Sequence, residues 1–170
     1  SNGELANDLG NLAQRVLSMV YKNCDQSIPQ PDDLNLEDTA LINSARKLLP
    51  DVRAALDKQA YSDALELIWI VVRASNSYVD QQAPWRLNKN DKARMNTVLF
   101  VLMEVLRLIA LIMQPFIPDS ASKILDQLGI LNDKRGFSFF SETNSLNIGA
   151  HINQPEPVFR KLDLDLESIG

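Results

Sequence analysis

The sequence has few of the residues from which catalytic and metal sites are usually built. Its 170 residues include one cysteine, Cys24, and one histidine, His151. A single cysteine excludes an internal disulfide and a cysteine-rich zinc site, and a single histidine excludes motifs that need two. The sequence also has no glycine-rich phosphate loop and no Ser–His–Asp pattern. We therefore expect no catalytic, cofactor-binding or metal-binding residue, and we interpret His151 as solvated or structural.

Signals for export and membrane insertion are also missing. The first residues lack the basic and apolar pattern of a secretory signal. The longest apolar stretch, 98–113, is interrupted by Glu104 and Arg107, and it is shorter than the roughly 20 residues that a membrane span needs. We expect this stretch to be a buried helix. The scarcity of cysteine favours a reducing, cytoplasmic location, and we expect no membrane partner.

The charge of the chain is negative overall but uneven along the sequence. A formal net charge of −5 opposes nonspecific binding to nucleic acids. Between residues 86 and 94, however, four basic residues stand against one acid, which gives a local charge of +3. These residues are Arg86, Lys89, Lys92 and Arg94, against Asp91. Any contact with RNA must therefore be local to this segment.

Hydrophobic periodicity predicts an all-α fold, an antiparallel bundle of about five helices. The predicted helices cover residues 4–23, 36–58, 62–82, 92–114 and 121–128. Pro50 predicts a kink or two shorter helices near residue 49. Asp119 or Ser120 is the predicted cap of the last helix, and Gly129 its end. Residues 86–91 are predicted to form a loop.

After the helices, the pattern weakens toward the C-terminus. We expect residues 1–130 to form the bundle and residues 131–170 to form a loop and an extended tail. Phe137, Phe139 and Phe140 are predicted to hold this loop on the bundle. Nothing in the sequence indicates an obligate dimer, so we expect a monomer.

Polar side chains recur along one side of the first predicted helix. Asn7, Asn11 and Arg15 are spaced four residues apart, so they stack along the helix surface. Asparagine is a poor helix former, which favours a use of the amides in recognition or in bonding a neighbour. The alternative is an ordinary solvated face.

Trp85 follows a proline that interrupts a helical pattern. Pro84 places this large aromatic side chain at a helix end, close in sequence to Arg86 and Lys89. An aromatic face on a stiff corner with cations nearby is typical of a platform on which an unpaired base stacks. The alternative is that Trp85 closes the end of the bundle, whereas Trp69 falls within the apolar pattern and is assigned to the core.

Three segments together resemble one family. Residues 4–15 are similar to the start of the anticodon-binding domain of methionyl-tRNA synthetases. Residues 78–85, Tyr-Val-Asp-Gln-Gln-Ala-Pro-Trp, resemble that family's Tyr-hydrophobic-Asp-x-x-Ala-Pro-Trp motif, and the Met-Gln-Pro-Phe-Ile-Pro corner at 113–118 also matches. The resemblance covers essentially the whole chain. It implies a helical bundle that follows a catalytic domain and recognises the CAU anticodon loop of methionine tRNA.

The resemblance also implies roles for individual residues. Trp85 would stack on the first anticodon base, and Asn11 and Arg15 would bond the anticodon bases and backbone. Asn7, Arg86 and Lys89 are added as candidates for contacts with the RNA backbone, from their proximity in sequence alone. The partners implied are methionine tRNA and the catalytic domain of the parent enzyme, which would use ATP and methionine.

The sequence departs from the family in two places. The His-x-Gly-His and Lys-Met-Ser-Lys-Ser motifs of the catalytic domain do not occur, so this chain is interpreted as a part of the enzyme that lacks its catalytic site. The tail reads Pro-Val-Phe-Arg-Lys at 157–161, without the second proline that is common in the family. Two alternatives stay open: a helical protein–protein interaction module, and the anticodon domain of a related synthetase such as the valine or isoleucine enzyme.

Overall fold

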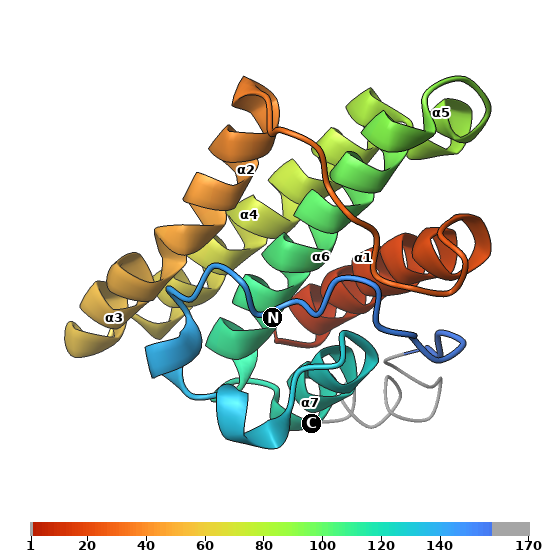
Figure 1. The fold of residues 1–170 in the computed structure, drawn as a ribbon. Coiled ribbons are helices and arrows are strands. Elements are labelled where there is room, and N and C mark those ends of the chain that lie inside the picture. The colour runs from red at the N-terminus through yellow and green to blue at the C-terminus, as the bar shows by residue number, and fades with distance from the viewer. Residues whose placement is uncertain (1, 158–170) are drawn as a thin grey trace.

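Helices make up almost all the regular structure of this chain. The structure, a computed structural model, describes residues 2–157, and within that range it contains no strand. The helices are α1 (Asn2–Asn23), α2 (Leu36–Arg46), α3 (Leu48–Asp57), α4 (Tyr61–Gln82), α5 (Pro84–Asn90), α6 (Lys92–Met113) and α7 (Pro118–Gln127), followed by the short 3-10 helices η1 (Asn132–Lys134) and η2 (Phe137–Phe139). The prediction of an all-α bundle is confirmed (Figure 1).

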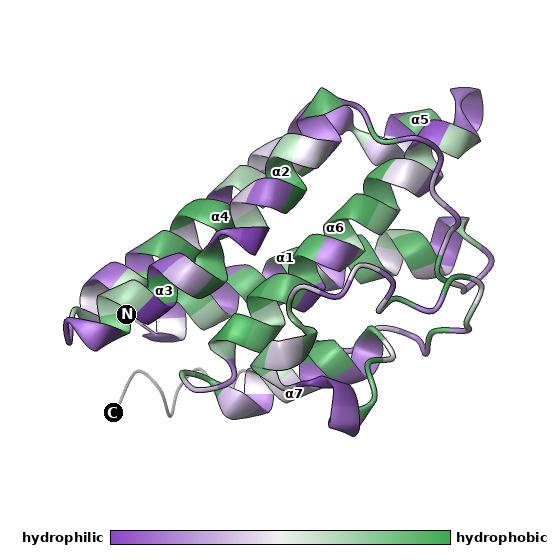
Figure 2. Ribbon diagram, turned by 60° about the vertical axis from the view of Figure 1, so that its left-hand side comes forward, coloured by the Kyte–Doolittle hydropathy of each residue, from purple (hydrophilic) through white to green (hydrophobic). Residues whose placement is uncertain are grey.

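The central element of the bundle is α6, the most apolar stretch of the sequence. α1, α2, α4, α5 and α7 all pack against it, and Figure 2 shows hydrophobic colouring along most of its length. By length and composition alone this helix could cross a membrane, but 89% of its apolar window is buried inside the bundle. The prediction of a buried helix here is confirmed.

Prolines shape the helix boundaries in two places, and the prediction is confirmed at the first, where two shorter helices were expected near residue 49, and wrong at the second. The predicted helix 36–58 is two helices that meet at Lys47. Pro50 lies in the first turn of α3, where a backbone N–H has no acceptor within the helix, so its missing N–H costs no hydrogen bond. The loop predicted at 86–91 is wrong, because these residues belong to α5 up to Asn90. Proline is as favourable at the first position of a helix as it is unfavourable inside one. Pro84 therefore begins α5 as well as following the end of α4.

The start of α7 also differs from the prediction. This helix begins at Pro118, and its N-cap residue, Ile117, makes no side-chain cap hydrogen bond. Asp119 and Ser120 lie inside the first turn, so neither is the cap that we predicted. Gly129 follows the end of the helix with a φ of +75°, as expected for a glycine that terminates a helix.

The segment after α7 lies against the bundle. Phe140, Leu146 and Ile152 are buried in the same core as the helices, while Phe137 and Phe139 are partly exposed. Backbone hydrogen bonds join residues 149–152 to residues 26–28, where the exposed His151 pairs with Ser27 in an isolated bridge. The predicted tail beyond Pro157 lies outside the described residues.

Candidate functional site

The polar stripe predicted on the first helix lies on α1. Leu5, Leu9 and Leu12 turn into the core with almost no exposure, so the opposite side of the helix faces outward. Asn11 and Arg15 are exposed, and Asn7 is partly buried. The two exposed side chains are one turn apart on the outward side of α1.

A sharp corner between α4 and α5 presents Trp85. α4 ends at Gln82, and Ala83 adopts the left-handed conformation, with φ 47° and ψ 60°. A residue other than glycine in this region costs about 1–3 kcal/mol and persists only where its surroundings constrain it. Buried Pro84 then begins α5, which leaves the Trp85 side chain 43% exposed.

The fold brings Arg15 from the first helix onto the ring of Trp85. The Arg15 guanidinium carbon lies 5.3 Å from the centre of the Trp85 ring, within the range of a cation–π interaction. Its Nη2 donates a hydrogen bond of 2.9 Å to Oδ1 of Asp80, in the last turn of α4. Three helices thus contribute one side chain each to an exposed cluster that combines an aromatic face, a guanidinium and a carboxylate.

The helical conformation of α5 arranges the nearby cations. Lys89 is four residues after Trp85, so both side chains project from the same side of the helix. Arg86 and Lys89 are both exposed. Asn88 joins α5 to the end of α1 by donating a hydrogen bond of 3.4 Å to Asn23. The structure therefore places all six predicted site residues on α1 and α5, and it places Arg15 and Trp85 in contact.

Arg94, which the sequence counts among the basic residues near Trp85, is paired with a carboxylate inside the bundle. Its Nη1 and Nη2 donate hydrogen bonds of 2.7 and 2.9 Å to the two carboxylate oxygens of Asp38, which is fully buried. This pairing neutralises one of the four basic charges between residues 86 and 94. The excess positive charge that faces solvent in this segment is therefore smaller than the sequence predicted.

Asp38 is the buried centre of a polar network whose outer members, Gln82 and Arg94, are partly exposed. The hydroxyl of Tyr78 donates a 2.6 Å hydrogen bond to Asp38, and Arg94 also donates a 2.8 Å hydrogen bond to Oε1 of Gln82. The backbone N–H of Asn35 donates a further hydrogen bond of 3.1 Å to Asp38. We call Asp38, Tyr78, Gln82 and Arg94 the Asp38 cluster; it joins the first turn of α2, the end of α4 and the first turn of α6.

The hydrogen bonds of this cluster fix its charges. Burial alone would raise the pKa of Asp38, but the hydrogen bonds from Arg94 and Tyr78 outweigh it and hold this pKa below its usual value. Burial, and then the hydrogen bond to Asp38, raise the pKa of Tyr78, so its hydroxyl stays protonated. The hydrogen bond with Asp38 raises the pKa of Arg94.

Sequence reasoning missed Asp38, Asp80 and Gln82. Asp80 and Gln82 lie inside the motif at 78–85. Their nearness to Trp85 could be read from the sequence, but the residues that they bond lie far away along the chain or beyond the proline and could not. Asp38 lies far from that motif in sequence. Only a carboxylate at the third position of a helix, which closes a capping box with Asn35, marks it as special.

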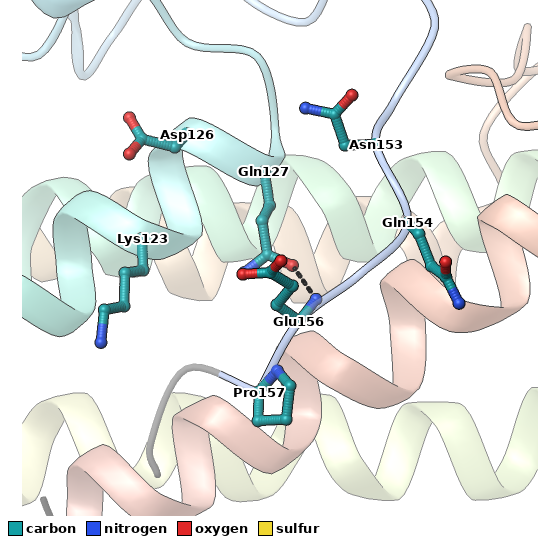
Figure 3. Close-up of a pocket in the computed structure, with 7 residues that line it drawn as sticks. All are labelled: Lys123, Asp126, Gln127, Asn153, Gln154, Glu156 and Pro157. Carbon is teal, nitrogen blue, oxygen red and sulfur yellow. Dashed lines mark hydrogen bonds between the residues drawn. The ribbon is translucent and has the colours of Figure 1, made fainter.

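A hollow of about 460 Å³ lies elsewhere, between α7 and the segment near residue 157 (Figure 3). It is lined by Lys123, Asp126, Gln127, Asn153, Gln154, Glu156 and Pro157. Figure 3 shows the backbone N–H of Glu156 bonded to Oε1 of Gln127, at 3.1 Å. Two carboxylates against one lysine do not favour a polyanion, so the corner at Trp85 remains the candidate site for RNA. Within residues 2–157, no group of three or more acidic, histidine or cysteine side chains is arranged to hold a metal ion.

Comparisons with known proteins agree on one family. Residues 28–168 match the family described as the anticodon-binding domain of methionyl tRNA ligase. The methionine–tRNA ligase of Brucella suis is 47% identical over 159 residues, which cover 94% of this chain and 31% of that protein. The enzyme of Mycobacterium tuberculosis is 48% identical over 141 residues, 81% of this chain and 27% of that protein. The chain thus spans about a third of the length of these relatives.

Solved structures give the same result. The crystal structure of apo Mycobacterium tuberculosis methionyl-tRNA synthetase matches with a TM-score of 0.87 and 43% identity, over 93% of this chain and 32% of that one. The same synthetase bound by methionyl-adenylate matches with a TM-score of 0.86 and 43% identity, over 91% of this chain and 31% of that one.

Proposed function

Because this chain belongs to the family of anticodon-binding domains of methionyl-tRNA ligases, we propose that it binds the CAU anticodon loop of methionine tRNA. The observation that carries the proposal is the contact between Arg15 of α1 and Trp85 of α5 at an exposed corner. Neither side chain can be assigned to the core, and each is of a type that binds unpaired nucleotides. Membership of this family also separates the chain from the valine and isoleucine enzymes considered above.

In the proposed complex, Trp85 stacks on the first anticodon base. A flat aromatic ring gives this base a stacking surface, and stacking contributes about 1–3 kcal/mol per base. Arg15 and Asn11 bond the neighbouring bases and backbone, since a guanidinium donates in a fork and an amide both donates and accepts. Asn7, Arg86 and Lys89 extend the contact to phosphates.

The parent enzyme, in this proposal, attaches methionine to its tRNA in an ATP-dependent reaction in the cytoplasm. Relatives three times as long as this chain have room for the catalytic domain. This chain would then act at a distance: correct contacts with the anticodon place the acceptor end of the tRNA in the catalytic site, which belongs to another part of the enzyme. ATP and methionine bind to that part, and this chain contributes the specificity for the tRNA.

The test is the affinity of this chain for two RNA hairpins that differ only in the anticodon. A fluorescently labelled hairpin with a CAU loop and one with a single changed anticodon base are titrated at low salt. The proposal predicts that the CAU hairpin binds at least about tenfold tighter, because each good base contact gives about 1–3 kcal/mol of discrimination. Equal, salt-sensitive binding of both hairpins would contradict it.

If the isolated domain binds RNA too weakly to measure, a second experiment uses the full-length enzyme. The full-length parent is then compared with its Trp85→Ala variant in methionylation of tRNA. A large rise in KM for tRNA is the expected result, and unchanged methionylation would contradict the proposal. A helical protein–protein module predicts no response to RNA in either arm.

A further inference from the structure

The segment that carries Trp85 is held at both of its ends. Residues 83–91 leave α4 after Gln82 and enter α6 shortly before Arg94. The Arg94 guanidinium donates a hydrogen bond of 2.8 Å to Oε1 of Gln82, so one direct bond closes the base of this segment. Trp85 lies only three residues from that closure.

The closure is fixed in turn to a third helix. Oε1 of Gln82 accepts from Arg94, while its Nε2 donates a hydrogen bond of 2.6 Å to Oε2 of Glu37. Arg94 is held by both oxygens of Asp38, in the same first turn of α2. Both ends of the segment are therefore tied to a helix that does not itself carry a predicted RNA-binding residue.

Two features of the corner make such a constraint necessary. Ala83 is held in the left-handed region, where a residue with a side chain stays only if its surroundings fix it. The Trp85 ring is 43% exposed, so core packing alone does not set its orientation. A side chain that must be ordered during binding weakens binding, and one that is ordered beforehand does not.

From these contacts we infer that the Asp38 cluster is a positioning device for Trp85. Its residues do not touch the anticodon; they hold the corner so that the indole ring presents its face in one orientation. Gln82 is the member that transmits the constraint, since it is the last residue of α4 and bonds Arg94 directly beside the corner, whereas Tyr78 bonds Asp38 one turn earlier in the same helix. This inference rests on the proposed function, because it assigns the reason for the constraint to the stacking of a base.

The same helix provides a control in its C-terminal half. Arg107, with 0% exposure, forms an ion pair of 2.6 Å with Glu104 and donates hydrogen bonds to the carbonyl oxygens of Phe139 and Glu142. This pair is more buried than Arg94–Asp38, in which the Arg94 side chain is 21% exposed, and it holds the segment after α7. Changing Arg107 tests the loss of a buried ion pair without disturbing the corner.

The experiment compares Gln82→Met, Arg94→Lys and Arg107→Lys in a Trp69→Phe background, in which Trp85 is the single tryptophan. Methionine keeps the length of glutamine and removes both hydrogen bonds, and lysine keeps the charge and removes the bidentate geometry. Three quantities are measured: the unfolding temperature, the quenching of Trp85 fluorescence by acrylamide without RNA, and the Kd for the CAU hairpin.

Gln82→Met and Arg94→Lys are expected to increase the quenching of Trp85 and to weaken CAU binding about two- to tenfold, the cost of ordering a side chain on binding. Arg107→Lys is expected to lower the unfolding temperature and to leave the quenching and the Kd unchanged. Gln82→Met is the milder variant, because it leaves the Asp38–Arg94 pair intact.

A purely structural role has a different result. If Gln82→Met and Arg94→Lys lower the unfolding temperature but leave quenching and Kd like those of Arg107→Lys, the inference is wrong. The quenching needs no RNA. If the unchanged protein fails to distinguish the two hairpins, the proposed function fails, and quenching alone then decides whether the cluster positions Trp85.

Discussion

The two tryptophans of this chain have the same kind of neighbours in different settings. An arginine guanidinium lies over each ring, Arg73 at 5.8 Å from the centre of Trp69 and Arg15 at 5.3 Å from that of Trp85. Each arginine is also paired with an acid, Arg73 with Glu66 at 2.6 Å and Arg15 with Asp80 at 2.9 Å. The combination of tryptophan, arginine and carboxylate therefore does not by itself identify a binding site.

The difference lies in how each group is assembled. Glu66, Trp69 and Arg73 belong to one helix, where spacings of three and four residues bring side chains together without any tertiary structure. The indole N–H of Trp69 is already bonded, to Asp8 at 2.9 Å, and its ring packs partly against the core. The group at Trp85 needs α1, α4 and α5, and its ring is exposed. An exposed arrangement that only the complete fold can build favours recognition over local stability.

Alanine at each tryptophan gives the largest expected effects. Trp85→Ala is expected to weaken CAU binding by about one to two orders of magnitude, from the loss of about 1–3 kcal/mol of stacking, with little loss of stability. Trp69→Ala is expected to lower the free energy of unfolding by about 2 kcal/mol, less than a fully buried tryptophan because its ring is only partly covered. Urea unfolding and hairpin titration of both variants check this. A large loss of stability in Trp85→Ala would show that this residue belongs to the core.

Alanine at Arg15 and at Arg73, the arginines that lie over the two tryptophans, should have a smaller effect on RNA binding than alanine at Trp85. Arg15→Ala is expected to weaken binding of the CAU hairpin about tenfold and to reduce discrimination between anticodons, because it removes a charged hydrogen-bond donor at the site. Arg73→Ala should leave affinity unchanged. Both arginines are largely exposed, with side-chain exposures of 41% and 58%, so neither variant should change stability by more than about 1 kcal/mol. Equal effects on affinity would contradict the assignment of Arg15.

Acidification should lower the free energy of unfolding in part through Asp38. The pKa of Asp38 is held below its usual value in the folded protein, so the unfolded chain takes up this proton first. The stabilisation is complete well above the usual value and is lost as the pH falls through the folded-state pKa. Asp38→Asn should therefore be less stable near neutral pH and lose less stability on acidification than the unchanged protein. Urea unfolding at about pH 6 and about pH 3 measures this, and parallel losses in both proteins would contradict it.

The smallest expected effect concerns Lys89, on the same side of α5 as Trp85. If it contacts a phosphate, Lys89→Ala should weaken both hairpins equally, by a few-fold, and reduce the salt dependence of binding by about one charge. Lys58 is exposed at the end of α3 and serves as the control. An unchanged salt slope in Lys89→Ala would remove this residue from the interface.

Much of the fold could be predicted from local pattern. The apolar periodicity of α1, α4 and α6 gave their extent to within a few residues, because each helix buries one side or, for α6, almost all sides. The boundaries between helices were harder to predict than the helices themselves. Proline both ends and begins helices, so Pro84 alone could not show that Trp85 lies inside a second helix.

The candidate site could be predicted only in part, for a related reason. The stripe of Asn11 and Arg15 follows from helical spacing, and the exposure of Trp85 agrees with its place after a proline. The pairing of Arg94 with Asp38 joins residues far apart in sequence, so counting charges along 86–94 included Arg94 without showing that a buried carboxylate holds it. A charge is available to RNA only if no buried partner holds it, and that depends on the tertiary structure.

Base stacking on Trp85 is tested most directly with each tryptophan as the single fluorophore. Trp69→Phe leaves only Trp85 to fluoresce, and Trp85→Phe leaves only Trp69. Both proteins are titrated at low salt with the CAU hairpin and with a hairpin of changed anticodon. Stacking of an anticodon base on Trp85 predicts quenching of Trp85 by the CAU hairpin at lower concentrations than by the other hairpin, and no change at Trp69. Equal responses of the two tryptophans, or of Trp85 to the two hairpins, would contradict a base-stacking role for Trp85.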